Sequence, residues 1–269
     1  MSSEQESRSF DGIGKLLSNL AVSSPRAAYS MAGKLGALRN RVTRRWPRVD
    51  EVQSLFPLLD AHDAANVAAR IGALYERNRV LVRSIQRHGI DPVRSFVSAS
   101  EPLASMKGPR ILATFHVGAV NALGPALERF ASPVLAFRQG RLFTPRGSLE
   151  IQSTEGDEQR RAATLHRALL HLREGGIVVV ALDVVPDLGT ETQCLGHTLR
   201  LAPGAFALAR WSGAPIIPIT ARWTADGVRI DAGEAVSTPD EAATWLERYL
   251  LESPSELTLG LLRMLLGVS

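Results

Sequence analysis

A histidine directly follows the stretch of the chain that most strongly predicts a buried strand. Residues 111–115 are apolar apart from Thr114 and are preceded by Lys107-Gly108-Pro109, which predicts a short strand with a turn before it. His116 comes next, and Gly118 allows a sharp turn before a helix expected over residues 122–130. Open α/β sheets place their chemistry at the carboxyl ends of their strands. His116 is therefore a candidate general base, and the alternative is a loop histidine satisfied by backbone groups.

Two further polar side chains follow expected strands. Asp183 ends the apolar run 177–182, and Arg138 follows the strand expected over 133–137. If these strands are neighbours, both side chains converge with His116 on one rim of the sheet. A histidine base, a polar orienter and a cation suit acyl transfer to a hydroxyl. The guanidinium of Arg138 would bind a phosphate or carboxylate of the acceptor or donor with its planar fork, and the alternative is a surface ion pair.

Common catalytic constellations are absent from the sequence. It contains no Gly-rich dinucleotide loop, no P-loop, no nucleophile elbow and no zinc-type histidine pairing. His166 and His171 lie five residues apart, too far round a helix to share a face well. The single cysteine, Cys194, excludes an intrachain disulfide, favours a reducing compartment and is expected to be structural.

The order of expected elements predicts the fold class. From residue 111 to 223 strands alternate with helices, which indicates an α/β fold with a mostly parallel sheet covered by helices. An N-terminal helical segment precedes it, with short helices in 11–60, a long helix over 63–88 and an irregular connector over 91–108. Residues 1–108 are thus expected to form a helical segment and 109–269 the α/β core. Two capping boxes, beginning at Thr238 and Ser253, are expected to open the last two helices.

Positive charge is concentrated at the start of the chain. Residues 1–50 hold nine lysines and arginines against four acids, whereas the remainder holds 22 against 23. Leu16, Leu20, Leu35 and Leu38 recur at helical spacing among these cations. A basic amphipathic helix pair predicts a peripheral protein on the cytoplasmic, inner face of an anionic cell membrane. The alternatives are a solvated helical face and a docking surface for an acidic carrier protein. Nucleic acid is not expected, because no binding motif or aromatic interleaving is present.

The motifs, taken in order, resemble one family. Residues 111–118, Ile-Leu-Ala-Thr-Phe-His-Val-Gly, are similar to the histidine motif of the lysophospholipid-acyltransferase-like superfamily, in its lipid A late acyltransferase (lauroyl/myristoyl transferase) branch. Further similar segments are Leu135-Ala136-Phe137-Arg138, Arg173-Glu174-Gly175-Gly176 with the strand that ends on Asp183, residues 195–218, and residues 246–254. The resemblance covers roughly residues 10–265.

This resemblance implies an acyltransferase. The expected reaction moves a fatty acyl chain from an acyl carrier protein or acyl-CoA thioester to a hydroxyl, or an amine, of a lipid, glycolipid or specialised metabolite, with no metal and no cofactor. His116 corresponds to the general base, and Gly118 and Ala119 lie on the acceptor side. Backbone N–H groups near Gly118 are expected to hold the oxyanion.

The chain departs from the family at the residue that orients the histidine. The family has an acidic residue five positions after the histidine, where this chain has Asn121, and Ala119 and Val120 replace an Asn-Trp pair. An amide can fix a tautomer, but it cannot stabilise an imidazolium as a carboxylate does. Three interpretations follow: catalysis with Asn121 as the orienter or with Asp183 supplying the charge, a non-catalytic relative that binds an acyl carrier or lipid, or a hydrolase.

Overall fold

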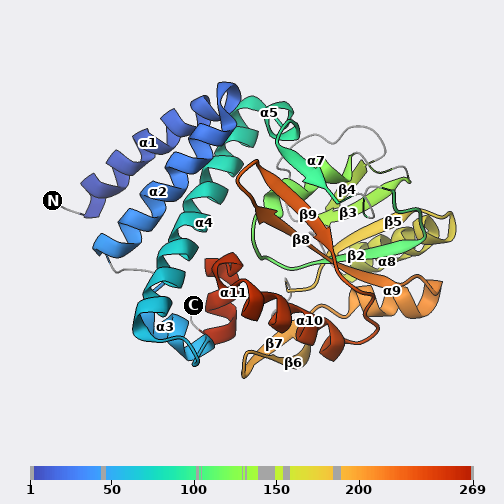
Figure 1. The fold of residues 1–269 in the computed structure, drawn as a ribbon. Coiled ribbons are helices and arrows are strands. Elements are labelled where there is room, and N and C mark those ends of the chain that lie inside the picture. Colours follow the sequence, from blue (N-terminus) through green and yellow to red (C-terminus); the bar gives the residue numbers. More distant parts are fainter. Residues whose placement is uncertain are drawn as a thin grey trace.

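One seven-stranded sheet organises the molecule (Figure 1). The structure is a computed structural model and describes residues 3–43, 47–100, 103, 105–128, 130, 132–138, 149–153, 158–183 and 189–267. The strand order is β1-β9-β8-β2-β5-β3-β4. The strands are β1 (Val97–Ala99), β2 (Arg110–Thr114), β3 (Val134–Arg138), β4 (Leu149–Ser153), β5 (Ile177–Ala181), β8 (Ile216–Trp223) and β9 (Val228–Ala232).

The pairing confirms the predicted α/β class. Strands β8, β2, β5, β3 and β4 run parallel to one another, and β9 returns antiparallel to β8. The central strand β2 is buried along residues 111–114, as expected for a parallel strand with both faces covered. Every strand predicted between 111 and 231 is present, with ends shifted by a few residues.

Three strands were not predicted from the sequence. β1 lies inside the connector expected to be irregular, and β4 lies in the segment after β3, where no strand was expected. The third, β6 (Thr190–Cys194), pairs antiparallel with β7 (His197–Leu201) as a separate hairpin. β1 is only three residues long, β4 is an edge strand, and four of the five residues of β6 are polar. None of them gives the apolar run that marks a central strand.

Residues 3–43 and 47–94 form a helical layer beside the sheet (Figure 1). Its helices are α1 (Ser3–Ser23), α2 (Pro25–Thr43), α3 (Val49–Leu55), α4 (Ala61–His88) and α5 (Asp91–Arg94). α2 approaches α4 closely, because a Cβ on Gly36 would lie 2.3 Å from the carbonyl oxygen of Gly72. The predicted N-terminal helical segment is therefore confirmed. Within the described residues, no helix is long and apolar enough to cross a bilayer.

Two hydrophobic cores cover the two faces of the sheet. Alternation along β2 directs Ile111 and Ala113 into one core and Leu112 into the other. The helix α4 belongs to both: Ile71 packs in the first core, and Leu81, near its other end, packs in the second. The long helix therefore ties the N-terminal layer to both faces of the sheet.

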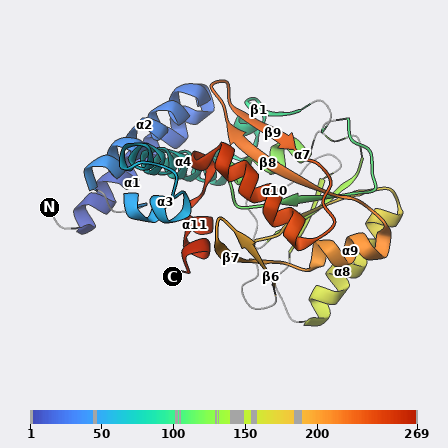
Figure 2. The ribbon, with the colours of Figure 1, turned by 60° about the horizontal axis from the view of Figure 1, so that its bottom comes forward.

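The remaining helices complete the layers. They are η1 (Val120–Ala122), α7 (Leu123–Leu127), α8 (Glu158–Arg173), α9 (Gly204–Ser212), α10 (Pro239–Glu252), η2 (Pro254–Glu256) and α11 (Leu259–Leu266). The β6–β7 hairpin packs beside α10 and α11 (Figure 2). Thr238 caps α10 by accepting from the Glu241 N–H at 3.2 Å, as predicted.

The second predicted capping box is wrong. Ser253 makes no side-chain cap, η2 occupies residues 254–256, and the N-cap of α11 is Thr258. The Glu256 side chain, expected to point back to the helix start, is instead buried. It lies against the loop that follows β2.

Candidate active site

The register of β2 and β5 brings the two leading candidate residues together. Thr114 on β2 pairs with Ala181 on β5, so the residue two positions beyond each strand end falls at the same height. Those residues are His116 and Asp183. The condition stated from the sequence, that their strands be neighbours, is therefore met.

Asp183 holds His116 with both carboxylate oxygens. Its Oδ1 lies 2.8 Å from the ring Nδ1 of His116, and its Oδ2 accepts the backbone N–H of the same residue at 2.7 Å. The carboxylate side chain is fully buried, whereas 46% of the imidazole surface is exposed. A carboxylate only accepts, so in the neutral imidazole Nδ1 carries the hydrogen and Nε2 holds the lone pair. This is the protonation pattern that a general base requires.

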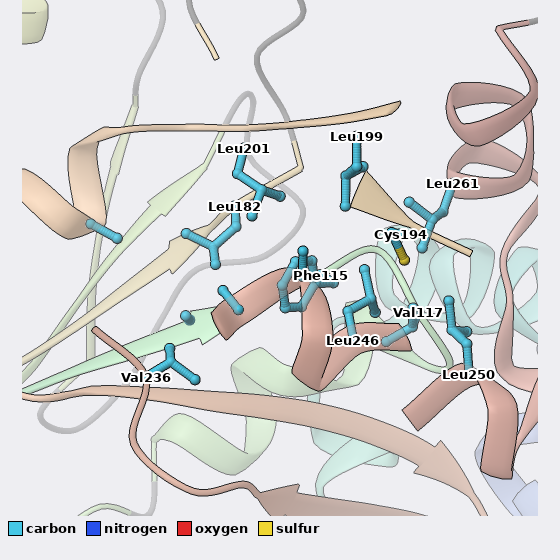
Figure 3. Close-up of a cluster of buried hydrophobic side chains, with 14 of the residues drawn as sticks. Phe115, Val117, Leu182, Cys194, Leu199, Leu201, Val236, Leu246, Leu250 and Leu261 are labelled. Carbon is cyan, nitrogen blue, oxygen red and sulfur yellow. The ribbon is translucent and has the colours of Figure 1, made fainter. Parts of the chain in front are cut away.

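Apolar neighbours fix the positions of both polar residues. Phe115 and Val117, on either side of His116, are fully buried, as is Leu182 before Asp183. Figure 3 shows these three side chains gathered with leucines from β7, α10 and α11. The Phe115 ring also stacks on Trp245 at 6.1 Å between centroids. Since its flanking residues are anchored in the core, His116 is held with its ring at the surface.

The loop after His116 is bonded along its backbone. The N–H of Val117 donates to Phe115 at 2.8 Å, that of Gly118 to the Glu256 carbonyl at 2.8 Å, and that of Ala119 to the Ala221 carbonyl at 2.6 Å. These three amides are therefore occupied, so an oxyanion near Gly118, as predicted from the sequence, would need other N–H donors.

The other predicted site residues lie near this edge of the sheet. Asn121 is in η1, and Ala119 is fully buried. Arg138 ends β3, which neighbours β5 on the side away from β2, but its side chain is outside the described part of the molecule. The structure places the Asp183 carboxylate on the Nδ1 of His116, while the orienting role of Asn121 remains a prediction.

Gly118 is required by the packing around the loop. Its φ is +57°, and an added Cβ would lie 2.0 Å from the Ala221 carbonyl oxygen and 2.7 Å from Oε2 of Glu256. Both the backbone conformation and the space are therefore closed to a larger residue.

Gly118→Ala is expected to lower the free energy of unfolding by about 2–4 kcal/mol, from backbone strain plus displacement of the β8 backbone. Urea denaturation followed by circular dichroism measures this loss. Gly260→Ala is the matched control, because its added Cβ meets no atom within 4 Å. A loss below about 1 kcal/mol for Gly118→Ala would contradict the packing described above.

Other candidate sites are few in the described residues. No group of three His, Cys, Asp or Glu side chains there is arranged to hold a metal ion. A pocket of about 120 Å³ lies between α2, α4 and the β8–β9 turn, with Arg26, Tyr29, Arg77, Phe96 and Trp223 among its lining residues. His116 and Asp183 do not line it.

Comparisons with known proteins include a structural similarity. No protein-family model matches the sequence, and no curated protein matches it significantly. The fold is similar to that of the 1-acyl-sn-glycerophosphate acyltransferase PlsC from Thermotoga maritima, with 14% identity and a TM-score of 0.34 over 85% of this chain and 93% of that chain.

Proposed function

We propose that this protein is an acyltransferase that moves a fatty acyl chain from an acyl carrier protein or acyl-CoA thioester to a hydroxyl, or an amine, of a lipid, glycolipid or specialised metabolite. The observation that supports this most is the His116 ring, half-exposed and bonded through Nδ1 to the buried Asp183 carboxylate. The sequence motifs give the reaction class. The pair supplies a base with the correct tautomer at a place that a substrate can reach.

In this mechanism Nε2 of His116 removes the proton from the acceptor hydroxyl as its oxygen attacks the thioester carbonyl carbon. The tetrahedral intermediate then breaks its C–S bond, and the thiolate leaves. The imidazolium returns the proton to the departing sulfur. Asp183 stabilises the imidazolium between these two transfers. The oxyanion requires donors other than the amides of residues 117–119, which are already bonded.

The test is an assay with separated donors. Purified protein is incubated with acyl carrier protein thioester or with acyl-CoA, together with a cellular lipid extract, and products are identified by mass spectrometry. An acylated acceptor supports transfer, while free fatty acid alone supports the hydrolase alternative. Donor binding without any product, unimpaired by His116→Ala, supports the non-catalytic alternative.

We also propose that α1 and α2 bind the inner surface of an anionic membrane. Large apolar side chains are exposed on both helices: Leu16, Val22, Met31, Leu38 and Val42 are between 46% and 74% exposed. Exposed cations stand among them, including Lys15, Lys34 and Arg41. Apolar residues with interspersed cations suit the interface of an anionic bilayer.

Flotation with vesicles tests this membrane proposal. Binding is expected to vesicles that contain anionic lipid, and it should weaken as salt is raised. The double variant Met31→Ser/Leu38→Ser is expected to reduce binding at least about tenfold, since each change removes an apolar side chain from the membrane-facing stripe. Leu170→Ser, which alters an exposed leucine on α8, should bind as the parent does. Equal binding to neutral and anionic vesicles, or no binding to either, contradicts the proposal. A pull-down with acyl carrier protein tests the alternative, that these helices dock a carrier protein.

A further inference from the structure

Three consecutive residues near the end of the chain hold the loop that carries His116. The hydroxyl of Thr258 donates to the backbone carbonyl of His116. Leu257 forms an antiparallel bridge with Val117, and the carbonyl of Glu256 accepts the N–H of Gly118 at 2.8 Å. Residues 256–258, called the clamp below, therefore contact residues 118, 117 and 116 in turn.

The side chain of Glu256 continues the clamp beneath the loop. Only 9% of the residue is exposed, and its Oε2 has no hydrogen-bond partner among the described residues. That oxygen lies 2.7 Å from the point where Gly118 would carry a Cβ. The carboxyl group therefore packs directly against the backbone two residues after His116.

Charged groups from two other elements act on Glu256. Arg77 on α4 and Arg222 on β8 act on it electrostatically. Arg222 also forms an ion pair with Asp231 on β9, at 3.1 Å. Burial, followed by the Glu256 carboxylate, raises the pKa of Tyr249 on α10. Burial raises the pKa of Glu256 to about 7, and the two arginines oppose that rise.

The loop is also held by α4. Asn78, the residue after Arg77, donates to the carbonyl of Gly118 at 2.7 Å and accepts from the indole N–H of Trp223 at 3.1 Å. Arg77 itself lies over the Trp223 ring, 5.9 Å from its centroid. A change in the charge of Glu256 therefore alters its interaction with the same short stretch of α4 that holds Gly118.

We propose that Glu256 is a positioning residue for His116, acting through Gly118, and that its ionised form holds the loop in the geometry that catalysis needs. The inference rests on the proposed function for its catalytic readout. The ionised carboxylate attracts Arg77 and Arg222 around the loop. Protonation removes this attraction and leaves a neutral, buried group without a partner for Oε2.

The first test compares Glu256→Gln with the parent enzyme. The variant keeps the shape and removes the charge, so at pH 8 kcat should fall about tenfold while KM changes less than twofold. In the parent, log kcat should rise with pH on the acid side with a slope above one, because both the proposed base and Glu256 must be deprotonated. In the variant the slope should be one. Glu252→Gln, at the exposed last turn of α10, should leave both rate and slope unchanged.

The second test does not depend on activity. The backbone amide resonance of Gly118 should shift with a midpoint near pH 7 in the parent and in Glu252→Gln, and this step should be lost in Glu256→Gln. If the Gly118 amide resonance of the parent does not shift with pH, the inference is overturned, even if Glu256→Gln fails to fold. An unchanged kcat and slope in Glu256→Gln also overturns it. If the parent transfers no acyl group while the Gly118 amide titrates as expected, the proposed function fails and the coupling between Glu256 and the loop stands.

Discussion

Replacing Asp183 by asparagine is expected to reduce acyl transfer about 10⁴-fold, the loss seen when the same exchange is made in a serine hydrolase triad. Both carboxylate oxygens accept hydrogen bonds from His116, one from the backbone N–H and one from Nδ1. An amide offers only one acceptor oxygen. If that oxygen keeps the backbone bond, the amide NH₂ faces Nδ1 and forces the hydrogen onto Nε2. The ring then holds the wrong tautomer and cannot accept the proton of the acceptor.

The measurement is kcat for Asp183→Asn together with the ¹⁵N shifts of the His116 ring, which report the tautomer directly. Asp240→Asn is the control, because Asp240 accepts one hydrogen bond, from Thr192 at 2.6 Å, far along the chain from His116. It should keep the parent rate. If Asp183→Asn retains more than about a tenth of the parent rate, a loss far below the 10⁴ of a true triad, the carboxylate is not needed and Asn121 becomes the better orienter.

His116→Ala is expected to remove enzyme-dependent transfer, a loss of at least about 10³-fold, since a positioned base contributes up to about 10⁴. The fold should persist, because the ring is half-exposed while the residues on both sides are anchored in the core. Product formation by mass spectrometry and the melting temperature give the two readouts. Added imidazole should restore part of the rate, because the substitution leaves a solvent-reachable gap above Asp183.

His62→Ala, at an exposed position in the first turn of α4, is the matched control and should be fully active. Retention of transfer by His116→Ala would exclude His116 as the base. Loss of transfer together with a large fall in melting temperature would instead assign His116 a structural role.

The sequence predicted which polar residues stand at the strand ends better than it predicted the contacts around them. His116 and Asp183 each follow an apolar run, and carboxyl ends of parallel strands share one edge, so both could be identified as candidates. Their direct pairing could not be predicted, because it depends on β2 and β5 being neighbours although β3 and β4 lie between them in the chain. The family motif drew attention to Asn121, whereas in the structure the carboxylate of Asp183 contacts the ring Nδ1.

The incorrect predictions have a common cause, because the groups concerned have interaction partners that lie far away in the chain. The Gly118 and Ala119 amides looked available for an oxyanion, but their acceptors, Glu256 and Ala221, lie more than a hundred residues away. Ser253 to Glu256 has the pattern of a capping box, and local pattern alone cannot show that the Glu256 side chain is drawn under another loop. Such contacts are decided by tertiary packing, which overrides local preference.

The clamp formed by residues 256–258 has a consequence for how the protein matures. His116 bonds through its ring to a residue 67 positions later and through its carbonyl to one 142 positions later. Contacts so distant close large loops, and they form after local helices and hairpins. During synthesis from the N-terminus, strand β2 emerges long before the clamp exists. A growing chain thus carries His116 without the geometry that the proposed base requires, and this geometry is completed only with the last part of the fold.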